Sequence, residues 1–368
     1  MDDGLKFVIY TKGNVFRRQL VGMEANAELA ANVIPTAEFT IDDDHPAVAD
    51  ITEKGARCAV WFRGVERFRG RLKEKKGDGP DGQITAQVQG DLRKFWEWLG
   101  WPVPTQPLSN QSGAEYRVLT GKSETVVKTA LAETFTRLGV PWSVAATHGW
   151  GSTTRAELRM HPLGDKLMPL LDADRLVTVL SYPTDSTVRV DVRQPGTVPG
   201  ILTIDSGVPD GYQFSMEPPT ATRVIVGGRG EGTARQFKSV VDATREADWG
   251  DIIEVFKDAR NTDAGADITV DGREALAEGA PRVSVSTDLV ETDRFMYGTT
   301  YVEGDLVHVR VGPVDSIEQI SVSITESEST GVVVTPHIGE LDVSTDTNAA
   351  LAAAVAKLAR GVRDSGRR

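Results

Sequence analysis

The chain has 368 residues, with 41 Lys or Arg against 53 Asp or Glu, so its formal net charge is −12 at pH 7. This acidic balance argues against a general nucleic-acid or anionic-membrane binder, because either would need a positively charged surface. The length predicts several domains, each able to bury its own core.

The single cysteine, Cys58, excludes an intramolecular disulfide framework and a thiolate zinc site. Its apolar neighbours predict a buried side chain. The sequence has no N-terminal apolar run of the signal-peptide type and no long apolar segment, so we expect a protein that is made in the cytoplasm and does not span a membrane.

Residues 56–63, 65–73 and 83–89 are predicted to form three strands, the last two joined by a turn rich in Gly and Asp. The second strand alternates apolar or small residues with a basic stripe made of Arg67, Arg69, Arg71 and Lys73. One face is therefore predicted to be core and the other solvated. The stripe could also receive an acidic partner or nucleic acid, but a solvated strand face is the interpretation adopted.

Residues 92–108 (LRKFWEWLGWPVPTQPL) contain three tryptophans and three prolines. A short helix ending near Gly100 is predicted to lay Phe95, Trp96 and Leu99 on the first β-rich domain, and the prolines favour an extended exit. We interpret this segment as a domain boundary. An alternative stays open, in which sugars or bases stack on Trp96, Trp98 and Trp101.

Residues 109–198 mix helix and strand patterns. Ser123 is predicted to cap a helix that ends at Gly139, and a second helix is expected over 163–171. A hairpin is expected over 177–192. The first helix carries an apolar stripe formed by Val127, Ala130, Leu131, Thr134, Phe135 and Leu138.

From residue 199 onward the pattern returns to strands, with one short helix expected over 268–279. The expected strands are 222–226, 235–241, 252–257, 306–311, 317–324 and 332–336. They predict a second barrel or sandwich. An Ala-rich helix is expected over 348–362, with a narrow apolar stripe of Leu351, Val355 and Leu358, followed by a basic tail.

Four glycines in the stretch ATRVIVGGRGEGTARQF, residues 221–237, resemble a phosphate-binding loop. The spacing of Gly227 and Gly232 fits a Walker-type loop, but Thr233 and Ala234 stand where Lys and a hydroxyl are needed. Strand formers follow the loop instead of a helix. We predict a hairpin whose glycines supply positive φ angles, and no cofactor site.

Catalytic and metal-binding patterns are not found, so no catalytic residue, cofactor or metal is assigned. The histidines (His45, His148, His161, His308 and His337) have no metal-ligand spacing. Asp42, Asp43 and Asp44 could be read as a cation site, but consecutive side chains diverge, and a loop or strand end is preferred. No nucleophile elbow or acid/base pair stands out.

Several segments together resemble a family of minor tail proteins, or tail-tip hubs, of long-tailed actinobacteriophages, related in fold to the baseplate hubs of contractile-tailed phages. They are FRGRLKEKKGDGPDGQITAQVQGDL with WLGWPVP, LTGKSETVVKTALAETFTRLGVP, HPLGDKLMPLLDADRL, PTATRVIVGGRGEGTARQF and YGTTYVEGDLVHVRVGPVD. The similarity covers nearly the whole chain. None of these segments is catalytic.

The resemblance implies a β-rich α+β fold with four parts: a barrel-like tube domain (1–108), an α/β peripheral domain (109–198), a second tube domain (199–345) and a C-terminal helix with its tail (346–368). It implies a homotrimeric structural hub in the virion that contacts the distal tail ring and the tape measure protein, with phage DNA only in transit. A receptor- or glycan-binding tail protein is the alternative, and a cell-wall hydrolase is a further one.

Overall fold

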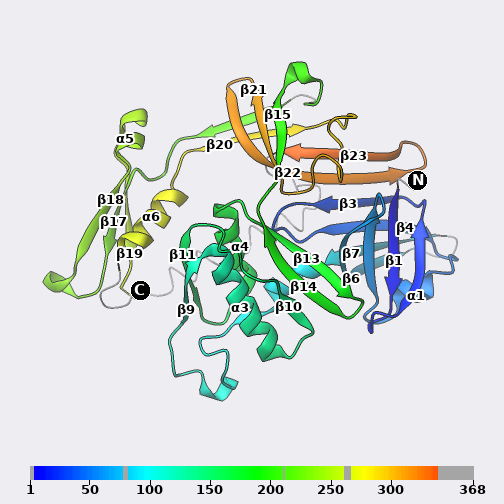
Figure 1. The fold of residues 1–368 in the computed structure, drawn as a ribbon, viewed down its shortest axis with the longest axis horizontal. Coiled ribbons are helices and arrows are strands. Elements are labelled where there is room, and N and C mark those ends of the chain that lie inside the picture. The colour runs from blue at the N-terminus through cyan, green and yellow to red at the C-terminus, as the bar shows by residue number, and fades with distance from the viewer. Residues whose placement is uncertain (1–3, 78–81, 210–211, 261–266, 339–368) are drawn as a thin grey trace. The chain divides into compact units, whose positions relative to one another are not determined.

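The computed structural model describes residues 4–77, 82–209, 212–260 and 267–338. These residues form two compact units, one made of the N-terminal part to residue 211 together with the part from Thr287 onward, and one made of residues 212–286. The predicted C-terminal helix over 348–362 lies outside the described residues. The β-rich α+β class is confirmed, because strands in several sheets dominate and helices are interspersed (Figure 1).

The N-terminal segment of the first unit is a curled antiparallel sheet with one short helix, α1 (Val48–Thr52). Its strands are β1 (Leu5–Tyr10), β2 (Phe16–Val21), β3 (Ala25–Leu29), β4 (Thr36–Asp42), β5 (Arg57–Phe62), β6 (Val65–Gly77) and β7 (Gln83–Gly90). The three strands predicted from residues 56 to 89 are β5, β6 and β7. Inward-facing side chains such as Phe7, Phe39 and Phe62 are fully buried, and so is Cys58. Burial raises the pKa of the Cys58 thiol, which keeps it protonated.

The C-terminal segment of the first unit joins this sheet directly. It consists of β15 (Thr197–Thr203), β21 (Leu306–Val311), β22 (Val314–Ser327) and β23 (Gly331–Ile338). β22 pairs with β3 in antiparallel register, with Val322 opposite Leu29 and Ile324 opposite Ala27. Strands more than 290 residues apart in sequence therefore belong to one sheet (order β23-β22-β3-β4-β7-β6-β5-β1-β2).

The predicted barrel-like domains are not confirmed, because no closed barrel is found in the part of the chain that the structure describes. A closed N-terminal barrel would require β2 to pair with β3. Instead β2 is the end of the sheet, and the free side of β3 is taken by β22.

Between these β segments lies an α/β segment with helices α2 (Lys94–Glu97), α3 (Ser123–Leu138) and α4 (Leu163–Ala173). Short 3-10 turns lie at Asp91–Arg93 and Leu108–Asn110. The strands are β8 (Leu99–Gly100), β9 (Arg117–Lys122), β10 (Trp142–Val144), β11 (Thr153–Leu158), β12 (His161–Pro162), β13 (Val177–Thr184) and β14 (Thr187–Arg193). The predicted helices and the β13–β14 hairpin are confirmed.

Two local predictions in this segment are wrong. Ser123 does not cap α3, because its hydroxyl donates to Asp174 Oδ2 at 2.5 Å, and the first free N–H groups of the helix bond to backbone carbonyls of residues 150 and 152. The helix before Gly100 ends at Glu97, and Phe95 is buried with α3 and α4, not against the N-terminal sheet. The C-terminal end of α3 is as predicted, because the helix stops at Gly139, which has φ 62°.

The second unit contains a three-stranded sheet of β18 (Phe237–Val241), β17 (Arg223–Gly227) and β19 (Glu254–Asp258), in that order. Helix α6 (Thr269–Glu278), the predicted one, packs against β17 and β18 through Leu276 and Val224. The unit also holds α5 (Ala243–Trp249) and the 3-10 turn Gly232–Ala234, with β16 (Gln213–Glu217) paired to β20 (Arg282–Asp288). The last two residues of β20 lie in the first unit.

Candidate functional site

The arginine row of β6 is where the three segments of the first unit meet. We use this name for Arg67, Arg69 and Arg71, whose side chains all lie on the side of β6 opposite the N-terminal core. The prediction of a solvated face is wrong for Arg69, which has 4% of its surface accessible, whereas Arg67 and Arg71 are partly exposed and Lys73 is exposed. Period-two alternation assigns one side of a strand to the core, but it cannot identify a distant segment that covers the other side.

Arg69 is clamped between two tyrosine rings that come from different segments. Its guanidinium lies 4.7 Å from the ring centroid of Tyr10 in β1 and 4.8 Å from that of Tyr182 in β13. The same group forms two hydrogen bonds to Glu66 and one to Asp185 Oδ1 at 3.2 Å. Tyr182 also donates its hydroxyl to the backbone carbonyl of Arg69 at 3.0 Å. The β13–β14 hairpin is therefore fixed to the N-terminal sheet by stacking and charge together.

The electrostatics of this clamp keep both partners in their ordinary charge states. Burial raises the pKa of Tyr182 well above its usual value, and the nearby Asp91 carboxylate adds to the rise. Burial lowers the pKa of Arg69, but the hydrogen bond and charge of Glu66 outweigh this and the net pKa is raised. A neutral phenol and a permanent cation therefore meet in a poorly solvated contact.

Arg67 holds a loop of the C-terminal segment. Its guanidinium lies 4.3 Å from the ring centroid of Tyr297, a fully buried residue whose hydroxyl donates to Glu303 Oε2 at 2.7 Å. Next to it, Arg63 pairs with Glu291 at 2.8 Å and also donates to the carbonyl of Tyr297. The loop over residues 291–303 is thus attached to the β5–β6 turn.

Arg71 reaches the start of the α/β segment. Its Nη1 lies 3.2 Å from Glu97 Oε1 at the end of α2, and Glu97 also pairs with the buried Arg93. Burial raises the pKa of Glu97, but the hydrogen bond from Lys94 and the charges of Arg93, Lys94 and Arg71 outweigh it, so the net pKa is lowered. Each arginine of the row consequently binds a different part of the chain.

Asn32 provides a second contact between the N-terminal sheet and the α/β segment. It adopts a left-handed conformation with φ 54° and is 5% exposed. Its amide donates to Asp172 Oδ1 at 2.7 Å and to the carbonyl of Leu176 at 2.8 Å, and its Oδ1 accepts from the backbone N–H of Thr178 at 2.8 Å. All of these partners lie at the end of α4 or the start of β13.

A third contact joins the α/β segment to the C-terminal segment. Arg193 donates to Asp305 Oδ1 and to the carbonyl of Glu303, both at 2.7 Å. Asp305 also accepts from the backbone N–H groups of Gly196 and Val302. A side chain on Gly196 would lie 3.1 Å from the Asp305 carboxylate, so the close approach favours glycine here.

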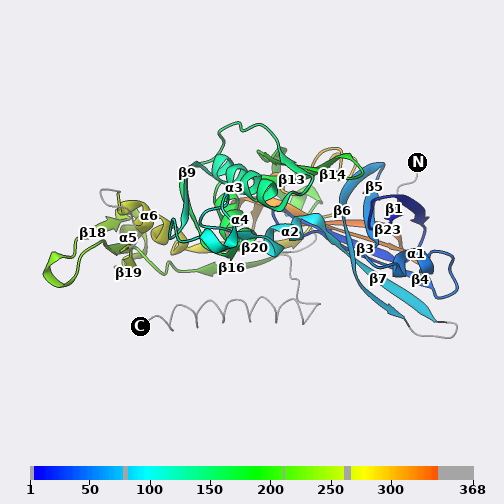
Figure 2. The ribbon, with the colours of Figure 1, turned by 90° about the horizontal axis from the view of Figure 1, so that it is seen from below.

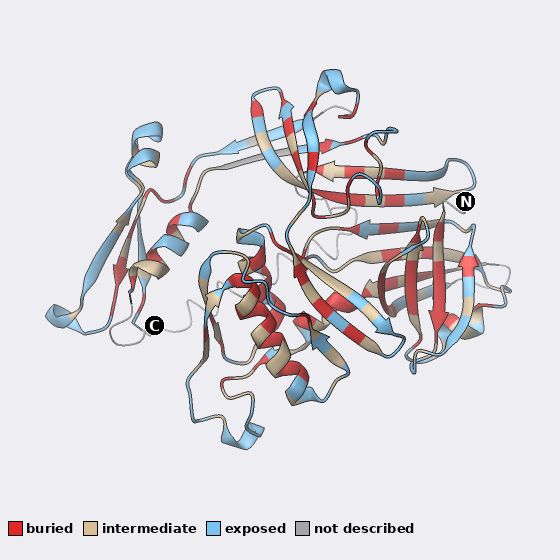
Figure 3. Cartoon of the chain, in the orientation of Figure 1, coloured by how far each residue is buried: buried red, intermediate tan, exposed pale blue. Residues whose placement is uncertain are grey.

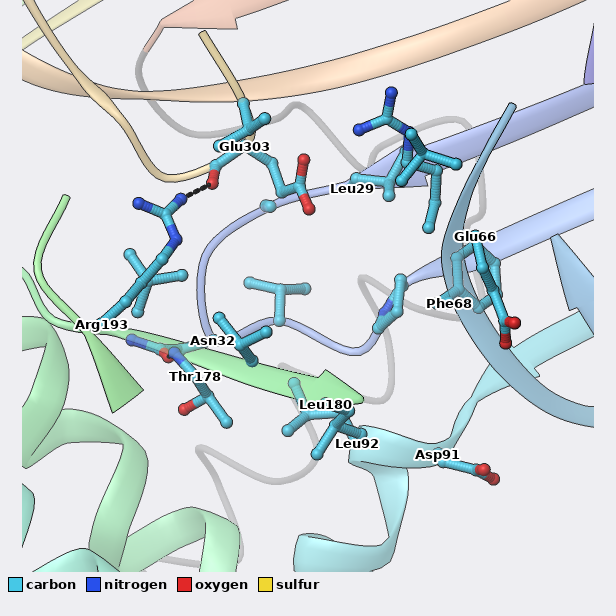
Figure 4. Close-up of a pocket in the computed structure, with 18 of the residues that line it drawn as sticks. Leu29, Asn32, Glu66, Phe68, Asp91, Leu92, Thr178, Leu180, Arg193 and Glu303 are labelled. Atoms are coloured by element: carbon cyan, nitrogen blue, oxygen red, sulfur yellow. Dashed lines mark hydrogen bonds between the residues drawn. The ribbon is translucent and has the colours of Figure 1, made fainter. Parts of the chain in front are cut away.

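A cavity of about 280 Å³ lies where these contacts converge. Figure 4 shows Asn32 and Leu29 from the N-terminal sheet, Thr178 and Leu180 from β13, and Glu303 from the C-terminal loop around it. The charged side chains in its lining already have partners: Glu66 pairs with Arg69, Asp91 with Arg57, Arg193 with Asp305, Glu303 with Tyr297, and Arg67 with the Tyr297 ring. The arrangement can hold three segments together, and the described residues around it offer no free nucleophile–base pair.

A cluster that sequence spacing did not reveal lies in the α/β segment. Ligand atoms of Glu124, His148 and Asp191 lie within 4.8 Å of one another. The ammonium of Lys128 is placed between the two carboxylates, 2.7 Å from Glu124 Oε1 and 2.7 Å from Asp191 Oδ1. Lys128 is 2% exposed, so this buried cation balances the carboxylates, and the cluster is a structural tie between α3 and β14.

The predicted glycine hairpin is present in the second unit. β17 and β18 pair in antiparallel register, and Gly230 and Gly232 between them have φ values of 102° and 52°. A side chain on Gly230 would lie 2.4 Å from the carbonyl oxygen of Ala234. A 3-10 turn and a strand follow the glycines, so the loop does not open a helix as a phosphate site requires.

The tryptophans of residues 92–108 mainly pack against other side chains. Trp96 and Trp98 lie against the core of the α/β segment, and Trp98 contacts Trp142 with a centroid distance of 5.0 Å. Trp101 is covered by the guanidinium of Arg137 at 4.2 Å. Among the described residues, no helix is long and apolar enough to cross a bilayer.

Three of the solved structures that are similar to this chain are phage tail proteins. The 43 kDa tail protein of prophage MuSo2 from Shewanella oneidensis is 12% identical, with a TM-score of 0.59 over 90% of this chain and 98% of that one. Prophage tail protein gp18 from Listeria monocytogenes is 13% identical, with a TM-score of 0.56 over 96% and 99%. The tail protein from Neisseria meningitidis is 12% identical, with a TM-score of 0.53 over 92% and 98%.

The sequence profile of the Siphovirus ReqiPepy6 Gp37-like protein family matches residues 25–340, and the chain belongs to this family. The resemblance to a phage tail protein family is thereby confirmed. No curated protein sequence matches the chain.

Proposed function

We propose that the protein is a structural, non-catalytic component of the phage virion, a tail-tip or baseplate hub that continues or closes the tail tube. The observation that carries this proposal is the β3–β22 ladder, which makes one sheet out of two distant β segments. A tube wall needs such an uninterrupted sheet, since a gap between tube domains would leave unpaired strand edges at the channel. The family and the shared fold support the same assignment.

We propose that the two β segments act as the two tube domains of each chain, within residues 1–108 and 199–345, and that residues 109–198 lie outside the tube. The arginine row supports this arrangement, because it fixes the α/β segment against one side of the sheet. The 346–368 segment would dock on a neighbouring tail component. A finite tail end also favours closed rotational symmetry, and three copies would place six tube domains around the axis.

In this role the partners are the distal tail ring, the tape measure protein and other tail-tip proteins, and phage DNA passes only in transit. A receptor- or glycan-binding tail protein is the second candidate, and a cell-wall hydrolase the third. The glycan-binding role relied on an exposed aromatic platform, whereas Trp96 and Trp98 pack against the α/β core. Glycan-array binding by the isolated protein would support the second role, and clearing of purified cell walls the third.

Reconstruction of the intact tail tip by electron microscopy tests the proposal. Three copies of the 39.8 kDa chain, about 119 kDa by multiplication, are expected around the axis with both β segments toward the channel. Six copies, β segments outside the tube, or absence of the chain from the tail tip would refute the hub.

A further inference from the structure

Helix α6 covers one side of the three-stranded sheet in the second unit and leaves the other side exposed. The covered side carries Val224, Val226 and Val240 (Figure 2). Strand pairing places the residues between them on the opposite side. We call this side the open face; its uncharged side chains are those of Ile225, Phe237, Ser239, Val241 and Phe256.

The open face exposes large apolar side chains. Phe237, Val241 and Phe256 have 58%, 45% and 53% of their surface accessible, and β18 is exposed over most of its length (Figure 3). The rings of Phe237 and Phe256 lie 6.5 Å apart between centroids. Arg235 stacks on both rings, at 5.6 Å and 5.3 Å, but it leaves them more than half exposed. A contiguous apolar patch of this kind marks a surface that binds a partner.

Acidic side chains border the open face at one end. Residues 242–254 contain five acids against one base, a net charge of −4. The ion pair between Arg223 and Glu246, at 2.8 Å, holds this segment beside the face, because Arg223 lies on the same side of β17 as Ile225. We call three exposed acids of this segment the acidic rim: Asp248, Asp251 and Glu254.

The C-terminal sequence has the complementary pattern. The stripe of Leu351, Val355 and Leu358 continues to Val362, and on a helix these eleven steps span about 16 Å. The strands of the open face have a similar length, about 13 Å from residue 237 to residue 241. Residues 348–368 contain five bases against one acid, a net charge of +4, and all the bases follow Val355. An apolar stripe and a basic end therefore match an apolar face with an acidic end.

We propose that residues 348–368 of a neighbouring copy dock on the open face, with the stripe on its apolar side chains and the basic tail on the acidic rim. This inference rests on the proposed hub function and names both the surface and the neighbouring component. The described structure ends at Ile338, so the nine residues 339–347 precede the docking segment. They can span up to about 30 Å when extended, which is enough to reach an adjacent copy.

Pairing of two open faces from two copies fits less well. Such a contact uses the same surface on both partners, so it generates a twofold dimer and does not repeat around a threefold ring. It would also bring two acidic rims together. The contact of a segment with a different surface is head-to-tail, and contacts of this type close into rings. The C-terminal segment is therefore the better occupant.

Disulfide trapping in phage particles tests the docking. One variant combines Ser239→Cys, on the open face, with Val355→Cys, in the stripe. The matched control combines Lys238→Cys with Val355→Cys, because Lys238 is the next residue of β18 and lies on the side that α6 covers. The native Cys58 is fully buried and leaves the background low. Particles are oxidised mildly, dissociated and analysed by electrophoresis without reductant, and a reduced sample measures incorporation.

The Ser239→Cys variant is expected to give dimers and trimers, with at least about tenfold more crosslinked product than the control, because a disulfide needs Cβ atoms about 4 Å apart. Equal products in both variants, an exclusively intrachain product or no product in particles that contain the chain would each overturn the inference. Absence of the chain from particles would instead refute the hub function. Products larger than trimers would refute the three-copy arrangement and still support docking between copies.

A charge test addresses the acidic rim. Asp248→Lys with Asp251→Lys, added to the Ser239→Cys variant, should lower the crosslinked fraction at low salt by about threefold or more, and the difference should vanish at high salt. Glu278→Lys, at an exposed position on α6, is the control and should leave the fraction unchanged. Equal crosslinking with and without the rim substitutions would overturn the contact between the basic tail and the rim.

Discussion

Two neighbouring strands of the same sheet, β6 with its arginine row and β7 with Gln83, Thr85, Gln87 and Gln89 on the same side, have the same alternating pattern and different surroundings. Arg67, Arg69 and Arg71 are each bound by an aromatic ring or acid from another segment. On the same side of β7, Gln83 is exposed and Thr85, Gln87 and Gln89 are partly exposed. The difference teaches that a strand side with several arginines can be an internal docking surface, because guanidinium groups stack and pair at once.

The largest expected effect in this comparison is the loss of Arg69. Arg69→Met is expected to lower the free energy of unfolding by about 3–5 kcal/mol, because it removes one partner of a buried ion pair and leaves Glu66 uncompensated. Lys73→Met, on the same side of β6 but exposed, should change it by less than about 0.5 kcal/mol. Chemical denaturation followed by tryptophan fluorescence reports on the first unit, which holds all the tryptophans except Trp249. Equal losses in both variants would contradict the docking role of the row.

The next largest loss of stability is expected from substitution of Asn32. Asn32→Ala is expected to cost about 2–3 kcal/mol, because the carbonyl of Leu176 and the N–H of Thr178 lose a buried partner and alanine is strained at positive φ. Asn32→Gly removes the same hydrogen bonds without the strain, so it should cost about 1 kcal/mol less. The same denaturation experiment measures both. If Asn32→Gly were as stable as the parent, the hydrogen bonds of Asn32 would contribute nothing.

How much could be predicted from the sequence differs between these features. The strands β5, β6 and β7, helices α3, α4 and α6 and the glycine hairpin follow from local periodicity and turn residues. The β3–β22 ladder cannot be predicted in this way, because the alternation around Ala27 or Ile324 does not indicate which strand pairs with it. For the same reason alternation alone predicts a solvated Arg69, since its partners Tyr182 and Asp185 lie more than 110 residues away.

The predicted helix cap at Ser123 is wrong for a related reason. Ser123 has the residue type and the place of a helix cap, but the loop containing Ser152 supplies backbone acceptors to the first turn of α3, and Asp174 takes the hydroxyl. The carboxylate–lysine cluster was invisible to spacing rules because Glu124, Lys128 and Asp191 come together only when α3 packs beside β14. Long-range packing decided each of these cases.

Substitutions in the glycine hairpin test how backbone conformation, as opposed to side-chain contacts, affects stability. Gly230→Val is expected to lower the stability of the second unit by about 1–3 kcal/mol, because the φ of 102° is strained for valine and its Cβ would clash with Ala234. Gly232→Ala, at φ 52° with open space around its Cβ position, should cost less. Limited proteolysis of the second unit measures the difference. Saturable ATP or NAD binding that Gly230→Val abolishes would contradict the hairpin interpretation.

Glu97 makes the arginine row sensitive to acid. Its pKa in the folded protein lies below the ordinary value of 4.5, so its pairing stabilises the fold above that value and is lost as the pH falls through the folded-state pKa. Since the side chain is 33% exposed, solvent screening limits the effect to about 1 kcal/mol. Glu97→Gln should therefore flatten the decline in stability below about pH 4.5. Glu115→Gln, in an exposed pair with Arg159, is the control and should leave the pH profile unchanged.

The smallest expected effect is at Gln87 on β7, the strand beside the arginine row. Gln87→Lys should change the free energy of unfolding of the purified protein by less than about 0.5 kcal/mol, because the position is half-exposed and a lysine there lies near Glu38 and Glu74 on the neighbouring strands. Denaturation of the isolated chain measures it. A loss of 2 kcal/mol or more would mean that the fold itself rejects a base at this position. A near-zero change would mean that this side of β7 tolerates a cation at little cost, whereas the stability of the sheet depends on the buried cation Arg69 in β6.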